Sequence, residues 1–384
     1  MELPNWIDHF PGNQMWSNAT LVTKGMAPYG AVALGEIDQV IEQLRDRQDD
    51  PNAWWEEWSA MAARLERTAD EAEAAGHRLT SGNYYLRAGM YYFTAERFIT
   101  PGPEKRAMGE KAIALQTIGI LRRYPNVERL EVPYEDTSLP ALFMKAQGVS
   151  GPAPTVVLFD GLDNCKEMSI LFCGVDFAAR GWNTLSIDGP GQGESLRLRD
   201  IKSRPDYEVA GTAAYEYVAS RPEVDASKVA VMGYSFGGYY APRVAAFEKR
   251  YAACVAFGAM HWNLVEWVEK IKENTSTDPR RSSTSRFQMP FAFGARDIDH
   301  AVEMAADFSL DGIADKIECP VLVAHGINDR LVPLEDAERL FAAIGSPNKK
   351  LVVFTEETGG AEHVQVDNRQ VGVDAIADWL SAYL

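Results

Sequence analysis

Ser235 is the residue whose setting most strongly indicates chemistry. It is the centre of the motif G-Y-S-F-G (residues 233–237), which follows an apolar run, KVAVMGY, and precedes a helical pattern, GGYYAPRVAAFE. A sharp turn from a strand into a helix strains the backbone of its central residue, and glycines two positions to either side leave the room that the turn needs. The motif therefore predicts a nucleophile elbow, whereas the plainer interpretation is a glycine-rich turn that contains a serine.

Two residues further along the chain are suited to activate this serine. Asp329 follows the apolar run VLVAHG, and His363 lies after the last apolar run, in FTEETGGAEHVQVD. A serine hydroxyl is a weak nucleophile and needs a base that a third group holds in place. The three residues occur along the chain in the order Ser, Asp, His. We expect His363 to accept the serine proton and Asp329 to orient the imidazole. The plainer alternatives are a turn or capping role for Asp329 and a surface loop for His363.

Backbone N–H groups near the serine are expected to bind the oxyanion that forms during attack. One donor is Phe236, at the start of the helix, and the second comes from the loop LFDGLDNCKE, where Leu162 is the first choice and Asp163 the second. Asp160 stands where many esterases have histidine. Further candidate substrate contacts are Tyr234, His261 and Trp262, together with Asp163.

Short apolar runs in the second part of the chain alternate with helical patterns and predict the scaffold of this site. Near-continuous apolar strands between helices indicate a mostly parallel sheet that is covered on both faces. The expected strands are RLEVPYE with its hairpin partner ALFMKAQ, then TVVLFDG, NTLSIDG, KVAVMGY, AACVAFG, PVLVAHG and KLVVFTE. We therefore expect a three-layer α/β core over residues 127–384, with a helical lid inserted at about residues 260–315.

Residues 1–126 are predicted to form a separate helical module. Apolar residues recur at helical spacing in 36–47 and 52–75, Ser81 is placed to cap a third helix, and a fourth is expected over 103–123. Many aromatic side chains lie in these helices, and the plainest interpretation is that they pack helix on helix. The alternatives are a substrate pocket or subunit interface, and a helical-hairpin array that binds a partner protein, although no 34-residue repeat is present.

Composition and charge exclude several classes of partner. The chain has 384 residues and a net charge of −17, which disfavours binding to nucleic acid or to an anionic membrane. The N-terminus does not resemble a secretory signal, no apolar run is long enough to span a membrane, and the four cysteines form no CxxC pair, so we expect a cytoplasmic protein with reduced thiols. The glycines of SIDGPGQGES do not match a dinucleotide-binding motif, and we expect no metal or cofactor.

Four motifs together resemble a known family. Residues 128–384 resemble the α/β-hydrolases, and FDGLDNCKE, DGPGQGES, GYSFGGYYAPRVA and HGINDRLVP resemble the 2,6-dihydroxypseudooxynicotine hydrolase group, which includes fungal polyketide-shortening hydrolases and is related to the fermentation-respiration switch esterases. The N-terminal helical region is also similar. The resemblance implies cleavage of a carbon–carbon bond next to a ketone in a β-diketone-like small molecule. It implies Ser235, Asp329 and His363 as the catalytic triad, with Glu266 as a substrate-binding acid; a solvated helix carboxylate is the alternative for Glu266.

The functional prediction is accordingly a serine hydrolase that cleaves a C–C bond in an aromatic or polyketide-like β-diketone. A carboxylesterase or lactonase would use the same three residues, because both reactions begin with attack on a carbonyl group. A third possibility is a hydrolase fold that serves mainly as a binding protein. The aromatic-rich helices and the acidic surface also lead us to expect a homodimer.

Overall fold

The computed structural model describes residues 5–258 and 262–384, and the chain divides into two compact units. The first unit contains residues 1–127 together with two short segments, 197–199 and 269–291. The second unit contains 128–196, 200–268 and 292–384. The division expected at residues 126–127 lies one residue before the end of the first segment, and part of the expected lid segment belongs to the first unit.

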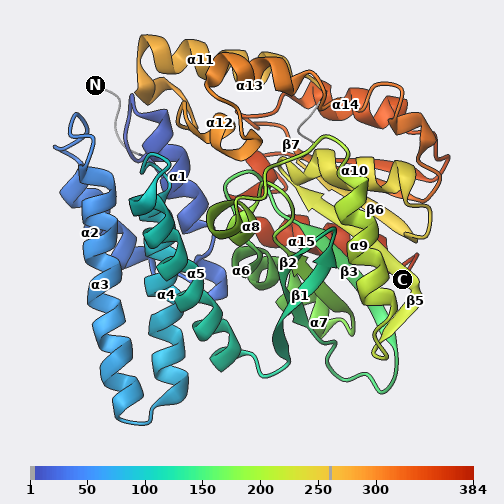
Figure 1. The fold of residues 1–384 in the computed structure, drawn as a ribbon, viewed down its shortest axis with the longest axis horizontal. Helices are drawn as coiled ribbons and strands as arrows, with labels where there is room; N and C mark the ends of the chain where they lie inside the picture. The colour runs from blue at the N-terminus through green and yellow to red at the C-terminus, as the bar shows by residue number, and fades with distance from the viewer. Residues whose placement is uncertain (1–4, 259–261) are drawn as a thin grey trace. The chain divides into compact units, whose positions relative to one another are not determined.

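The first unit is built from helices. They are α1 (Gln14–Lys24), α2 (Leu34–Leu44), α3 (Ala53–Ala74), α4 (Arg78–Glu96) and α5 (Pro103–Arg123). The long helices α3, α4 and α5 lie side by side, coloured blue to teal in Figure 1. Aromatic rings fill the space between them: the rings of Trp54 and Trp58 are 5.5 Å apart, and Tyr91 lies 5.6 Å from Trp58. All three side chains are buried, so these aromatics form a helix-on-helix core.

Two details of this unit differ from the sequence-based prediction. The third predicted helix begins at Arg78, so Ser81 is inside it and not at its cap. The Ser81 hydroxyl instead donates to Glu73 Oε2 at 2.6 Å and is 2.9 Å from the carbonyl oxygen of Arg78. Helix α1 was not predicted, because polar Ser17, Thr20 and Thr23 lie on its buried face and interrupt the apolar pattern.

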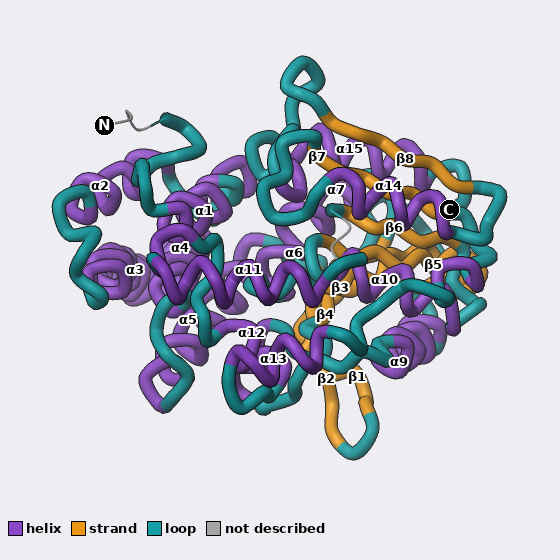
Figure 2. The backbone as a smooth tube through the Cα atoms, turned by 90° about the horizontal axis from the view of Figure 1, so that it is seen from above, coloured by secondary structure: helices purple, strands orange, loops and turns teal. Residues whose placement is uncertain are grey.

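The second unit contains one eight-stranded sheet, with the order β1-β2-β4-β3-β5-β6-β7-β8. The strands are β1 (Val127–Tyr134), β2 (Thr137–Met144), β3 (Ala153–Phe159), β4 (Asn183–Ile187), β5 (Val224–Tyr234), β6 (Ala253–Phe257), β7 (Val321–Gly326) and β8 (Lys349–Phe354). Strand β2 pairs antiparallel with β4, and all pairs from β4 to β8 are parallel. The strands lie next to one another in Figure 2, with the β1–β2 hairpin projecting from the sheet.

Helices cover both faces of this sheet. The helices that follow β2 in the chain, of which α11 and α12 belong largely to the first unit, are α6 (Lys166–Ser169), α7 (Val175–Ala179), α8 (Gly193–Arg199), α9 (Glu208–Ala219), α10 (Gly237–Phe247), α11 (Leu264–Thr277), α12 (Gln288–Phe293), α13 (Ile298–Ala305), α14 (Leu334–Ala343) and α15 (Arg369–Leu380). Figure 1 shows α9 and α10 in front of the sheet and α15 behind it. The predicted three-layer α/β fold with a mostly parallel sheet is therefore confirmed, and the interval between β6 and β7 is helical, as expected for an inserted segment.

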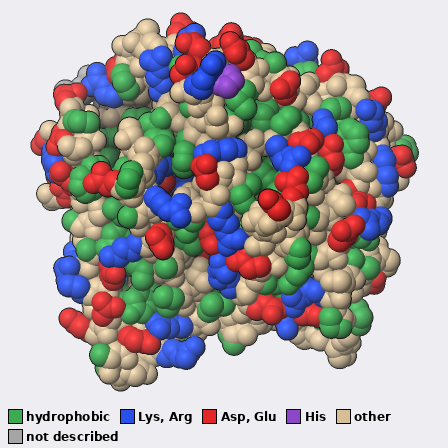
Figure 3. All heavy atoms as spheres, in the orientation of Figure 1, with side chains coloured by type: hydrophobic (Ala, Val, Ile, Leu, Met, Phe, Trp, Pro, Cys, Tyr) green, Lys and Arg blue, Asp and Glu red, His purple; other side chains and the backbone are tan. Residues whose placement is uncertain are grey.

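One face of the surface is drawn in Figure 3 with its charged side chains coloured by sign. On the face drawn in Figure 3, Asp and Glu side chains alternate with Lys and Arg and do not gather into one patch. In the described part of the chain, no helix has both the length and the apolar character that a membrane span requires.

Candidate active site

Ser235 occupies the sharp turn between β5 and α10. Its backbone φ is +57°, a left-handed conformation that a residue other than glycine rarely adopts. A β-carbon on Gly233 would collide with the carbonyl oxygen of Gly237, and one on Gly237 would lie only 2.8 Å from the carbonyl oxygens of Phe159 and Asp160. Both glycines are therefore required by close main-chain packing, which is the physical basis of the motif.

The structure brings Ser235, His363 and Asp329 into one chain of hydrogen bonds. His363 Nε2 is 2.8 Å from Ser235 Oγ, and His363 Nδ1 is 2.6 Å from Asp329 Oδ2. Since a carboxylate can only accept, Nδ1 carries the imidazole proton and Nε2 is left to accept the proton of the serine hydroxyl. The Asp329 side chain is fully buried and that of His363 is 12 % exposed. This arrangement is suited to nucleophilic attack on a carbonyl group.

Asp329 is held as a carboxylate by several donors. Its Oδ1 accepts the backbone N–H groups of Leu331 at 2.8 Å and Val332 at 2.9 Å. Burial alone would raise the pKa of Asp329, but His363 and these backbone donors outweigh it, so the pKa lies below the ordinary value. Burial lowers the pKa of nearby His325, whose Nε2 is 3.0 Å from the carbonyl oxygen of Val332. His325 is thus a neutral structural donor.

The loop that carries His363, between β8 and α15, is organised by Asp367. Asp367 Oδ2 accepts the N–H groups of Gly360 at 3.0 Å and Ala361 at 3.1 Å, and its Oδ1 accepts that of Glu362 at 3.1 Å. Sequence reasoning missed Asp367. The signal that could have found it is an acidic residue shortly after a Gly-Gly pair, where a side chain commonly accepts from nearby backbone N–H groups.

The Asp329 and His363 loops also contact each other directly. The N–H of Asn328 donates to the carbonyl oxygen of Ala361 at 2.8 Å. A β-carbon on Gly326, the last residue of β7, would overlap the carbonyl oxygens of Ala361 and Glu362. Only glycine lets the two loops approach this closely, and the approach fixes the position of the acid relative to the base.

The two predicted oxyanion donors lie on segments that border the serine. Phe236 is the N-cap residue of α10 and directly follows Ser235. On the other side, a β-carbon placed on Gly161 would be 2.9 Å from the Ser235 β-carbon, so the loop after β3 packs directly against the elbow. Leu162 in that loop is 5 % exposed, and Asp163 is half-buried. Donation to an oxyanion by Phe236 and Leu162 remains a prediction.

The remaining predicted substrate contacts lie in different environments. Tyr234 is fully buried, and its hydroxyl is 2.9 Å from Ser169 Oγ; its contact with substrate stays a prediction. Glu266 is exposed in the first turn of α11 and bonds to Asn263. Half-buried Trp262 has the Arg339 guanidinium 5.7 Å from its ring centre, and His261 lies outside the described residues.

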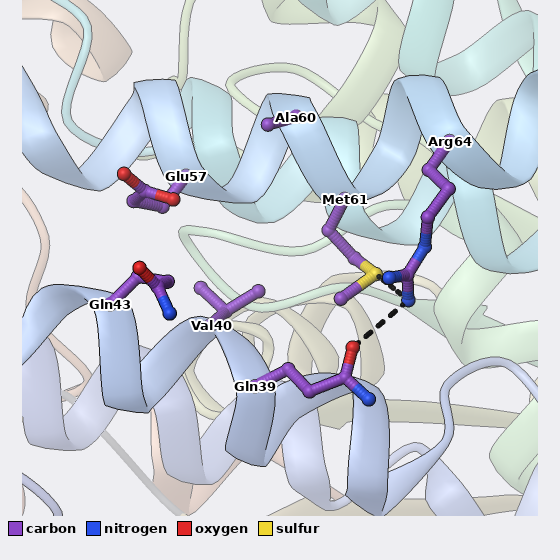
Figure 4. Close-up of a pocket in the computed structure, with 7 residues that line it drawn as sticks. All are labelled: Gln39, Val40, Gln43, Glu57, Ala60, Met61 and Arg64. Atoms are coloured by element: carbon purple, nitrogen blue, oxygen red, sulfur yellow. Dashed lines mark hydrogen bonds between the residues drawn. The ribbon is translucent and has the colours of Figure 1, made fainter.

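The structure also contains a groove on the first unit, with a volume of about 310 Å³. It lies between α2 and α3 and is lined by seven residues, among them Val40, Met61 and Arg64 (Figure 4). Arg64 Nη2 donates to Gln39 Oε1 at 3.1 Å and lies 3.0 Å from Met61 Sδ. The lining contains no serine, cysteine or histidine, so it offers no nucleophile comparable to Ser235.

Comparisons with known proteins identify the family of this chain. The family described as "Esterase FrsA-like" matches residues 48–381. Hydrolase LUC6 of a Fusarium species is 28 % identical over 89 % of this chain and 90 % of its own length. The 20-hydroxy-prefusarin hydrolase FUS2 of Gibberella moniliformis is 26 % identical over 93 % of this chain and 94 % of its own.

The fold is likewise shared with a solved structure. The crystal structure of 2,6-dihydroxy-pseudo-oxynicotine hydrolase superposes with a TM-score of 0.76 at 24 % identity, over 94 % of this chain and 95 % of that one. The resemblance expected from the four sequence motifs is thereby confirmed. The chain belongs to the FrsA-like esterase family and is an α/β-hydrolase.

Proposed function

We propose that this enzyme is a serine hydrolase that cleaves the carbon–carbon bond next to a ketone in an aromatic or polyketide-like β-diketone. The observation that carries the serine chemistry is the hydrogen-bonded chain from Ser235 through His363 to Asp329, with 2.8 and 2.6 Å between the bonded atoms. The choice of bond is supported by the motif resemblance to C–C hydrolases and by a relative that is named as the hydrolase of 20-hydroxy-prefusarin.

The first half of the reaction forms an acyl-enzyme. Ser235 Oγ attacks one ketone carbon while His363 Nε2 takes the hydroxyl proton, and the N–H groups of Phe236 and Leu162 stabilise the oxyanion. Collapse of the tetrahedral adduct breaks the bond to the neighbouring carbon. That carbon leaves with its electron pair as the enolate of the second ketone and is protonated by His363, directly or through water. A ketone is released, and the acyl group stays on Ser235.

The second half returns the enzyme to its starting state. Water loses a proton to His363 and attacks the acyl-enzyme, a second tetrahedral adduct forms in the same oxyanion site, and Ser235 leaves with the proton from His363. The products are one carboxylic acid and one ketone. Asp329 remains ionised throughout and stabilises the imidazolium in both halves.

A panel of aryl β-diketones, nitrophenyl esters and lactones tests this proposal. The wild type should consume a diketone and release equal amounts of acid and ketone, and Ser235→Ala should lower kcat by several orders of magnitude. Ser227→Ala is the control, because Ser227 is exposed and bonds locally to Asp225. A Ser235→Ala enzyme with full turnover would contradict the serine mechanism. Failure of a fluorophosphonate to label Ser235 would instead favour a protein that only binds its ligand.

A carboxylesterase or lactonase is the second candidate, and the esterase description of the matching family favours it. The same serine, base and oxyanion donors would serve, because only the leaving group changes from a carbon to an oxygen. Efficient cleavage of simple esters with untouched diketones would select this function.

We further propose a cytoplasmic homodimer. All four cysteines are free thiols, which fits a reducing compartment, and exposed apolar side chains of the first unit, such as Leu34, Leu79 and Ile118, are the part expected to take part in self-association. Light scattering at micromolar concentration should give twice the chain mass of 42.6 kDa. A single-chain mass would contradict the dimer and leave the proposed chemistry unaffected.

A further inference from the structure

Asp160, at the end of β3, lies directly beneath the nucleophile elbow. It is fully buried. Its Oδ1 accepts a hydrogen bond from the Ser169 hydroxyl and lies 3.2 Å from the hydroxyl of Tyr234, the residue before the serine. Its main-chain oxygen accepts from the Gln192 amide. One residue thus links the strand that ends in the nucleophile to the loop that leads to Leu162.

The neighbouring main chain is packed so tightly that this link fixes the position of the serine. Gly161, the next residue, approaches the Ser235 side chain closely, and Gly237 packs its Cα against the carbonyl oxygen of Asp160. A shift of Asp160 would therefore move either the predicted oxyanion donor or the nucleophile. A displacement of about 1 Å at a reacting centre can reduce a rate on the order of a hundredfold.

A second buried carboxylate, Asp188, is close enough to influence Asp160. The Asp188 carboxylate accepts hydrogen bonds from the Lys166 ammonium group at 3.0 Å and from the backbone N–H groups of Lys166 and Glu194 at 2.7 and 2.8 Å. Lys166 also forms ion pairs with Glu167 and Glu194, so this cation is shared among three carboxylates. Asp160 Oδ2 accepts no hydrogen bond from the described residues, and its neighbour on that side is the Asp188 carboxylate.

These surroundings disfavour a negative charge on Asp160. Burial, followed by the charge of Asp188, raises the pKa of Asp160 well above the ordinary range of a carboxyl group. The other acidic groups that face it are Tyr234, Tyr207, Cys165 and Cys173, and burial raises the pKa of each of them as well. The cations of this region are Lys166 and Arg369, and the Arg369 guanidinium stacks over the Phe172 ring at 4.6 Å.

We propose that Asp160 is a positioning residue. As an uncharged carboxylic acid, it holds the loop after β3, which carries Leu162, in place against the turn at Ser235. This inference rests on the proposed serine mechanism. In the uncharged form one oxygen accepts from Ser169 and Tyr234, and the proton on the other oxygen points towards Asp188. Loss of that proton would leave an unpaired charge beside Asp188, which would push the loop away from the serine.

Two substitutions separate this role from simple packing. Asp160→Asn keeps the size of the side chain and the accepting oxygen but has no acidic proton, so it should retain kcat within about threefold of the wild type. Asp160→Ala should lose on the order of a hundredfold in kcat with little change in KM, because the residue does not contact substrate. Asp225→Asn, at the second residue of β5, where the side chain bonds to Ser227, is the matched control and should change neither constant.

The pH profile supplies the decisive measurement. Wild-type kcat should fall as the pH rises through the raised pKa of Asp160, and the Asp160→Asn profile should lack that fall. The wild-type free energy of unfolding should also decrease as pH rises above about 4, since the folded state holds a proton that the unfolded state has released; Asp160→Asn should lack this contribution too. Profiles that coincide for the two proteins, or an Asp160→Asn enzyme as slow as Asp160→Ala, would overturn the inference.

Failure of the underlying mechanism gives a different result. If Ser235 is not the nucleophile, fluorophosphonate does not label it in the wild type, and no Asp160 variant changes the labelling. If only the role of Asp160 is wrong, the wild type is labelled at Ser235 and the alanine variant is labelled at the same rate. Circular dichroism of each variant at neutral pH shows whether it has folded.

Discussion

At the scale of single residues, the clearest requirement is the absence of a side chain at Gly237. A β-carbon there would lie 2.8 Å from two carbonyl oxygens, so Gly237→Ala has to displace the loop after β3 or the elbow itself. We expect kcat to fall on the order of a hundredfold and the free energy of unfolding to decrease by about 1–3 kcal/mol. Gly35→Ala is the control, because its β-carbon meets nothing within 4 Å. Equal activity in both variants would contradict the packing argument.

Asp329 should contribute to stability in a pH-dependent way as well as to catalysis. Because its pKa is lower in the folded than in the unfolded state, its contribution is present above about pH 4 and is lost as pH falls through the folded value. The difference in unfolding free energy between wild type and Asp329→Asn should therefore narrow in acid, and kcat should drop on the order of 10⁴-fold at neutral pH. Urea unfolding at acidic and neutral pH measures the difference in unfolding free energy. Asp46→Asn, on an exposed carboxylate, is the control for the loss of one acidic side chain.

The three residues of the predicted triad could be identified in the sequence because each follows a recognisable strand. Asp160 and Asp367 could not, although both hold the site in place. The sequence showed Asp160 only as a residue in the place where many esterases have histidine. Its burial and its proximity to Asp188 arise from the tertiary fold and cannot be read from the sequence. Asp367 acts on backbone groups, which every residue has, so its partners leave no pattern in the sequence.

At the scale of elements, the loop between β8 and α15 depends on one side chain. Asp367→Ala leaves three backbone N–H groups without their acceptor, and the loop should then hold His363 less firmly. We expect kcat to fall about tenfold or more with KM nearly unchanged, because Asp367 positions the base and is not expected to touch substrate. Steady-state kinetics measures both constants, with Asp311→Ala on an exposed turn as the control. A change confined to KM would argue for a direct substrate contact.

The helices and strands could largely be predicted from the sequence where their residues form an apolar pattern. Every strand from β3 to β8 contains a short apolar run, and the inner strands β3, β4, β6 and β7 bury nearly all of their side chains because the parallel sheet is covered on both faces. Helix α1 was missed because the hydroxyls on its buried face bond locally, as Thr23 does to the Ala19 carbonyl oxygen at 2.9 Å. The left-handed backbone of Val364, with φ +46°, could not be foreseen either, since a β-branched residue avoids that conformation unless tertiary packing imposes it.

At the scale of the whole molecule, the two units share one chain in an interleaved way. Residues 197–199 and 269–291 belong to the first unit, where Arg197 pairs with buried Glu96 at 3.1 Å and Lys105 lies 5.4 Å from the Phe287 ring. A fragment of residues 128–384 should therefore expose apolar surface and aggregate, which dye binding and size-exclusion chromatography can measure. Co-expression with residues 1–127 should reduce the aggregation. A monodisperse fragment that does not bind the dye would contradict this expectation.

The interleaving has a consequence for synthesis on the ribosome. The helices of residues 1–127 are synthesised first, but their unit also needs residues 269–291. By the time residue 291 has left the exit tunnel of the ribosome, the segment that carries Ser235 is already outside it. Domains generally fold from the N-terminus onwards as they are synthesised, whereas here the N-terminal unit is completed late. Arg197, the partner of Glu96, is synthesised before Ser235, whereas Phe287, which lies against Lys105, is synthesised after it, so we expect the first unit to stay incomplete during this stage of synthesis.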